Sequence, residues 1–175
     1  MKKNGHKLFT LVALLGTAAG VIHIANRFID ATSQLKDMLE QPHSKTYDWR
    51  FGKIHYTKQG HGAPLLLVHD MMPGASGYEW SSVEKQLATE HTVYTLDLLG
   101  CGRSEKPDIT YTNFVYAQLL CDFAKNVIQQ ETDVIASGFS GSFAIMAYRN
   151  NSDYFRKIML VNPPCLLYTS PSPRD

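Results

Sequence analysis

The chain has 175 residues, about the size of one domain, and is 44% hydrophobic and 19% charged. Its formal net charge of +1 gives no electrostatic case for nucleic acid or for an acidic partner. No Cys/His spacing indicates a metal site and no cofactor is expected. No two of the three cysteines form a CxxC pair, so free thiols are expected at Cys101, Cys121 and Cys165.

The first 25 residues indicate a membrane anchor or a signal. A mostly apolar run, Leu8 to Ile24, follows three lysines and is just long enough to span a bilayer as a helix. A cleaved signal peptide is the alternative, with Thr17 and Ala19 as the small-residue cleavage pattern. The apolar run continues past that point, so an uncleaved anchor is favoured over a secreted protein, and a buried soluble helix is a third possibility. Residues 26–45 form a polar linker.

Between residues 46 and 164 the pattern alternates between strands and helices. Short β-rich or apolar runs predict strands, and apolar residues at helical spacing predict helices. The strands are expected at 47–51, 53–57, 65–68, 92–96, 133–136 and 157–161, and the helices at 78–89, 114–129 and 143–150. Such alternation implies parallel crossover units. The fold class is therefore α/β, with a mostly parallel sheet of about six strands and helices on both faces.

A Gly/Ser-rich pentapeptide, residues 138–142, lies where the fifth predicted strand runs into a helix. It is close to the nucleophile-elbow pattern G-x-S-x-G, in which small neighbours let the strand and helix approach and a serine stands above the sheet. Ser140 is the candidate nucleophile, flanked by Gly138 and by Ser142, which replaces the glycine. The Gly141 N–H is one candidate oxyanion donor. A plain turn is the alternative.

Two further loops follow the third and fourth strands. In the loop that begins at His69, this histidine is expected to bond nearby backbone and Asp70 to cap the loop. In the second loop, Asp97 and Ser104 can bond loop amides, and the glycines at positions 100 and 102, Gly100 and Gly102, permit the tight turn. This second loop lacks G-x-G-x-x-G spacing, so a scaffold role is favoured over phosphate binding.

In this order the three segments resemble the α/β-hydrolase superfamily, in its small-molecule esterase, dehalogenase, epoxide-hydrolase and C–C-hydrolase branch. The resemblance implies an incomplete α/β-hydrolase fold over residues 46–164 and a small-molecule substrate. It also implies that the Met71 N–H is the second oxyanion donor, although Asp70 stands where the family's His-Gly-x loop has glycine. Dehalogenases and epoxide hydrolases place Asp at the elbow, so Ser140 favours acyl chemistry on an ester, thioester or amide.

The triad cannot be completed within this chain. A serine needs a base to take its proton, but all seven histidines precede Ser140, and Asn162 stands where some relatives carry the acid. The parent protein is therefore expected to be a serine hydrolase and this chain to be inactive by itself. A non-catalytic binding protein of the same fold, and an acyltransferase or perhydrolase on the same triad, are the alternatives.

The last eleven residues, 165–175, read CLLYTSPSPRD. Codons for this stretch can form DNA that resembles a common transposase sequencing adapter. We therefore expect a non-native tail on a gene interrupted near Pro164. A natural flexible tail is the alternative, because Ser-Pro repeats are loop-like.

Overall fold

A computed structural model describes residues 16–17, 20–27 and 43–164. The chain divides into two compact units, Met1–Glu40 and Gln41–Asp175. In the first unit, the described residues are helical and exposed. Within the part that the structure describes, no helix is both long and apolar enough to cross a bilayer. Most of the predicted anchor and linker and all of the predicted tail lie outside the described residues, so these three assignments stay predictions.

The second unit contains a six-stranded sheet in the order β1-β2-β4-β3-β5-β6. The two pairings that involve β2 are antiparallel, and the remaining three are parallel. This confirms the predicted α/β class and the mostly parallel sheet. The strands are β1 (Ser44–Trp49), β2 (Gly52–Gly60), β3 (Ala63–Val68), β4 (His91–Leu96), β5 (Thr132–Ser137) and β6 (Phe155–Val161).

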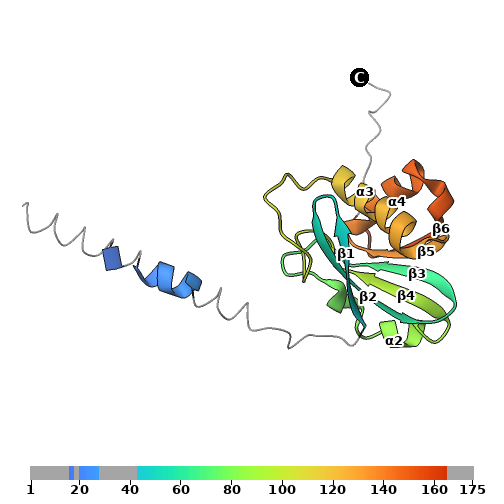
Figure 1. Cartoon of the computed structure of the whole chain (residues 1–175), viewed down its shortest axis with the longest axis horizontal. Helices are drawn as coiled ribbons and strands as arrows, with labels where there is room; N and C mark the ends of the chain where they lie inside the picture. Colours follow the sequence, from blue (N-terminus) through green and yellow to red (C-terminus); the bar gives the residue numbers. More distant parts are fainter. Residues whose placement is uncertain (1–15, 18–19, 28–42, 165–175) are drawn as a thin grey trace, which may run out of the picture. The chain divides into compact units, whose positions relative to one another are not determined.

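Helices cover both faces of this sheet, with α3 (Asn113–Phe123) and α4 (Ser140–Asn150) on one face and α2 (Glu84–Leu87) on the other (Figure 1). The helix predicted at 78–89 is instead a 3-10 turn, Gly77–Trp80, followed by the short α2. No side chain caps α2 at Val83. The buried Glu84 carboxylate instead accepts hydrogen bonds from the hydroxyls of Thr57 and Thr95, at 2.8 and 2.7 Å, which fixes α2 against the sheet.

The helix predicted at 114–129 also changes form near its end. Regular α-helix stops at Phe123, and Ala124–Ile128 form one π turn. Gln129 then takes a left-handed conformation with φ 60°, and its N–H donates to Ala124 O at 2.8 Å. The wider turn ends the helix just before β5 begins.

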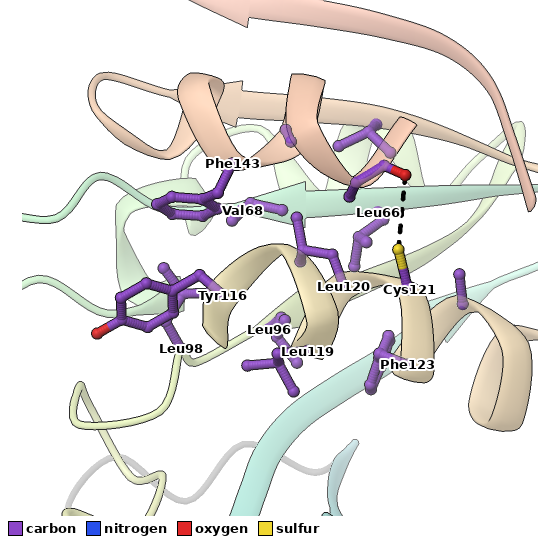
Figure 2. Packing of buried hydrophobic residues seen from close by; sticks show 14 of the residues in the cluster. Leu66, Val68, Leu96, Leu98, Tyr116, Leu119, Leu120, Cys121, Phe123 and Phe143 are labelled. Atoms are coloured by element: carbon purple, nitrogen blue, oxygen red, sulfur yellow. Dashed lines mark hydrogen bonds between the residues drawn. The ribbon is translucent and has the colours of Figure 1, made fainter. Parts of the chain in front are cut away.

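The main core lies between α3, α4 and the sheet (Figure 2). Fully burying one such apolar side chain contributes roughly 1.5–3 kcal/mol. Alternate residues of β3 face opposite sides, so the strand also packs into a smaller core under α2. The core beneath α3 and α4 includes Leu66, Val68, Leu96, Leu119, Leu120, Phe123 and Phe143, and the smaller one is formed by Leu65, Leu67, Trp80 and Val93.

Candidate active site

The sharp turn between β5 and α4 is at Gly138. This glycine directly follows β5 and has φ 53°, in the left-handed region that favours glycine. Phe139 is the N-cap residue, and α4 begins at Ser140. The apex of the elbow is therefore two residues earlier than the sequence pattern suggested.

Ser140 does not present its hydroxyl at the apex. Its side chain is buried, with 0% exposure, and Oγ donates to Ser137 O at 2.7 Å and to Val68 O at 3.3 Å. The expectation of an exposed Ser140 hydroxyl is wrong, because α4 begins three residues before the predicted residue 143. Its early start places Ser140 in the first helical turn, against β3.

The Gly141 N–H is also engaged within the helix. It donates to Gly138 O at 3.2 Å, so it is not free to bind an oxyanion as expected. A Cβ at position 141 would meet Leu160 Cδ2 at 3.0 Å, which shows how closely α4 approaches β6 here. The Ser142 hydroxyl donates to Phe139 O at 2.9 Å. Both residues thus serve the first turn of α4.

Two backbone amides converge on one oxygen beside the apex. The Met71 N–H donates to Asp70 Oδ1 at 2.7 Å, and the Phe139 N–H donates to the same oxygen at 2.8 Å. The resemblance predicts Met71 as a donor, whereas the sequence does not predict Phe139 as the other. The signal that could have found Phe139 is the small-residue register around Gly138, with Ala136 two positions before it and Ser140 two positions after.

Asp70 and Gly138 are sterically matched. A Cβ built at position 138 would overlap the Asp70 carboxyl group, so only glycine fits there while Asp70 keeps this rotamer. The main chain of Asp70 is held on both sides. Its N–H donates to Glu79 Oε2 at 2.8 Å, and its carbonyl oxygen lies 2.7 Å from His69 Nδ1. The carboxylate therefore lies in the space that a side chain at the apex would fill.

His69 is fully buried behind this loop. Leu98 N–H donates to its Nε2 at 3.0 Å, so Nδ1 carries the proton and donates to Asp70 O. Burial lowers the pKa of His69 despite that carbonyl and the carboxylates of Asp97, Glu79 and Asp70 nearby. The ring is therefore neutral at pH 7 and connects the two loops.

Asp97 organises the loop after β4. Its carboxylate accepts from the backbone N–H groups of Gly77 at 2.6 Å and Arg103 at 2.9 Å, while the Ser104 hydroxyl donates to Asp97 O at 2.6 Å. Burial pushes the pKa of Asp97 up. Hydrogen bonds from His55 and the two amides outweigh burial, so the pKa lies below its ordinary value.

The two loop glycines both have positive φ, 85° at Gly100 and 49° at Gly102. A Cβ at Gly102 would overlap the Asp97 carboxylate. Across the described ranges, no group of three or more His, Cys, Asp or Glu is arranged to hold a metal ion.

Comparison with known proteins identifies the family. The sequence profile described as the alpha/beta hydrolase family matches residues 65–174, more than half of the chain. The chain belongs to the α/β-hydrolase family. This family membership accounts for the sheet order and for the placement of all three loops at the carboxyl ends of β3, β4 and β5.

Three relatives illustrate the similarity. The soluble epoxide hydrolase of a Corynebacterium species is 30% identical over 110 residues, covering 63% of this chain and 38% of that protein. The haloalkane dehalogenase of Agrobacterium fabrum is 26% identical over 132 residues, covering 71% of this chain and 43% of that protein. The crystal structure of an N-formylmaleamic acid deformylase from Pseudomonas putida is 27% identical, with TM-score 0.63, covering 69% of this chain and 47% of that one. The chain thus spans less than half the length of each.

Proposed function

We propose that the full-length protein hydrolyses a small molecule at the carboxyl ends of β3 and β5, with Ser140 in a structural role. The observation that carries this proposal is the convergence of the Met71 and Phe139 amides on one oxygen. Two preorganised N–H donors aimed at one point can stabilise negative charge that develops on an oxygen during hydrolysis. The names of the epoxide-hydrolase and dehalogenase relatives support electrophilic small molecules as the substrate class.

Replacement of Ser140 tests this assignment in the full-length protein. Hydrolysis of a panel of esters, epoxides and alkyl halides would be compared for wild type, Ser140→Ala and the neighbouring control Ser142→Ala. We expect both variants to keep kcat/KM within about tenfold, since loss of a serine nucleophile costs on the order of 10⁶ in kcat. Thermal unfolding of each variant separates a folding defect from a catalytic one. A loss near the larger value, in a folded Ser140→Ala protein only, would reject the structural role.

Two other functions remain candidates for the same site. The pentapeptide favours a serine enzyme, in which Ser140 carries out acyl or ester hydrolysis, acyl transfer or perhydrolysis. It requires Oγ to leave the carbonyls of Ser137 and Val68. A non-catalytic binding protein is favoured by Gly138, which offers no side chain at the apex. A fluorophosphonate probe on Ser140 would support the serine enzyme, and ligand binding without any turnover would support the binding protein.

For the N-terminal segment we propose a membrane anchor, with secretion after cleavage as the alternative. Its support is the apolar run that follows the lysines near the N-terminus. Alkaline carbonate extraction of cells that express the full-length protein tests the anchor. Recovery in the membrane pellet is expected, whereas a shortened chain in the medium would favour the cleaved signal.

A further inference from the structure

We propose that Asp70 is the nucleophile of this site and attacks an sp³ carbon that bears a leaving group. This inference rests on the proposed hydrolase function and names its substrate class: small alkyl electrophiles such as epoxides or alkyl halides. It starts from the position of the Asp70 carboxylate, which comes from the loop after β3 and lies where a side chain at position 138, directly after β5, would be.

The two carboxylate oxygens of Asp70 are in different situations. Oδ1 accepts both amide hydrogen bonds, from Met71 and from Phe139. Oδ2 makes no hydrogen bond to any residue between 43 and 164 in this structure. One oxygen therefore fixes the orientation of the group, while the other keeps its lone pairs for attack. Because the Asp70 main chain is bonded on both sides, the carboxylate is preorganised.

The surroundings of the carboxylate suit an apolar substrate. Asp70 itself is half-buried, and two neighbouring apolar residues are exposed: Met72, two positions along the loop, at 56%, and Phe139, whose N–H binds Oδ1, at 54%. No lysine or arginine within residues 43–164 forms a salt bridge with Asp70. A half-buried carboxylate without a cationic partner is less solvated than one in bulk water, which strengthens it as a nucleophile.

The first chemical step forms an ester. Oδ2 bonds to the substrate carbon, and the carbon–leaving-group bond breaks with its electron pair on the leaving group. A halide departs as an ion, whereas an epoxide oxygen opens to an alkoxide that takes a proton from water. Attack by a carboxylate on an acyl carbon would form a high-energy anhydride, so an alkyl electrophile is the better match.

The second step explains why two amides bind Oδ1. Water adds to the ester carbon of Asp70, and negative charge develops on Oδ1, where the Met71 and Phe139 N–H groups already point. The bond between that carbon and Oδ2 then breaks. The product alcohol leaves with Oδ2 and one water hydrogen, and the other proton goes to solvent. The water oxygen stays in the regenerated Asp70 carboxylate.

Isotope labelling tests this assignment directly. The full-length protein would turn over styrene oxide or 1-bromobutane in H₂¹⁸O, and the peptide containing residue 70 would be analysed by mass spectrometry. We expect ¹⁸O in Asp70 after several turnovers and none in the exposed control residue Asp108. The Asp70→Asn variant keeps a side-chain oxygen for both amides but loses the nucleophile. It should fold with an unchanged Tm and lose turnover by roughly 10³-fold or more.

A transplant variant supplies an independent readout. Asp70→Gly combined with Gly138→Asp moves the carboxylate to the apex, into the space that the first substitution empties. We expect at least a tenfold recovery of turnover over Asp70→Asn, with the ¹⁸O label now at residue 138.

Three outcomes overturn one or both proposals. Turnover without ¹⁸O in Asp70, and with an active Asp70→Asn variant, overturns the nucleophile and leaves the hydrolase. A stable alkyl ester on Asp70 without repeated turnover supports the nucleophile and overturns the hydrolase. No turnover and no alkylation of Asp70 overturns both.

Discussion

At the residue scale, positions 70 and 138 constrain each other. The Asp70 carboxylate fills the space above Gly138, so a side chain at 138 and a carboxylate at 70 cannot both keep their places. The resemblance implies glycine in the first loop and a side chain at the elbow, whereas this chain has Asp70 in the first loop and Gly138 at the turn. We regard the pair as one structural unit.

A double-mutant cycle measures this coupling. Gly138→Ala should destabilise the protein by about 1–3 kcal/mol, because the Cβ displaces Asp70 and φ 53° is unfavourable for alanine. In an Asp70→Gly background the steric contribution to this destabilisation should disappear, and only the cost of the backbone conformation at position 138 should be left. Urea unfolding of the four proteins gives the interaction free energy. Additive effects would show that the two residues are independent.

The Asp97 carboxyl should make stability depend on pH in the acid range. Its pKa is lower in the folded protein than the unfolded value of about 3.9. The ionised Asp97 carboxylate therefore stabilises the fold at pH values above its unfolded pKa. This stabilisation is lost as the pH falls through its pKa in the folded protein. Urea unfolding between pH 7 and pH 2 should show a smaller loss of stability for Asp97→Asn than for wild type.

Asp133 provides the comparison for this pH dependence. Hydrogen bonding to Arg156 lowers the pKa of Asp133, but the pair is more exposed and more screened by solvent. Asp133→Asn should change the pH dependence less than Asp97→Asn does. Equal effects would mean that burial of Asp97 has no part in its contribution.

At the element scale, apolar patterning predicted the strand positions and placed the start of α3 within one residue, whereas it misplaced the starts of α2 and α4. The run at 65–68 is apolar on both faces, and β3 contributes to both cores, so its burial could be read from residue type alone. The start of α4 could not be read from residue type alone. Apart from Phe139, residues 136–142 are all small and fit more than one register, and the observed one places the Phe139 N–H on Asp70 Oδ1, 69 residues away in the sequence.

Packing of α4 on α3 should dominate the stability of this layer. Phe143 is 1% exposed and its ring centroid lies 5.0 Å from that of Tyr116. Phe143→Ala should lower the free energy of unfolding by about 3–5 kcal/mol. Phe114→Ala is the matched control, since Phe114 is 62% exposed and its loss should change stability by about 0.5 kcal/mol or less. Chemical denaturation of both variants checks the contrast.

At the scale of the whole molecule, Cys121 can report on unfolding. Burial and the Asp122 charge raise the pKa of the Cys121 thiol to about 11, and Sγ donates to Ala147 O at 3.5 Å. The thiol should react with Ellman's reagent at pH 8 only when the core opens. In a Cys101→Ala, Cys165→Ala background, its rate should follow the unfolding equilibrium as urea is added. Fast labelling in native buffer would show that the core between α3 and α4 opens locally.

The α3 carboxylate Asp122 holds together parts of the chain that are made at very different times. Its Oδ2 accepts from Trp49 Nε1 and from Arg50 Nη2, both at 2.8 Å, across 73 and 72 residues of sequence. During synthesis, the end of β1 must therefore wait until α3 has emerged from the ribosome tunnel. At about 5–20 residues per second, that interval is several seconds. The hairpin of β1 and β2 passes this time without the two hydrogen bonds that join the end of β1 to α3.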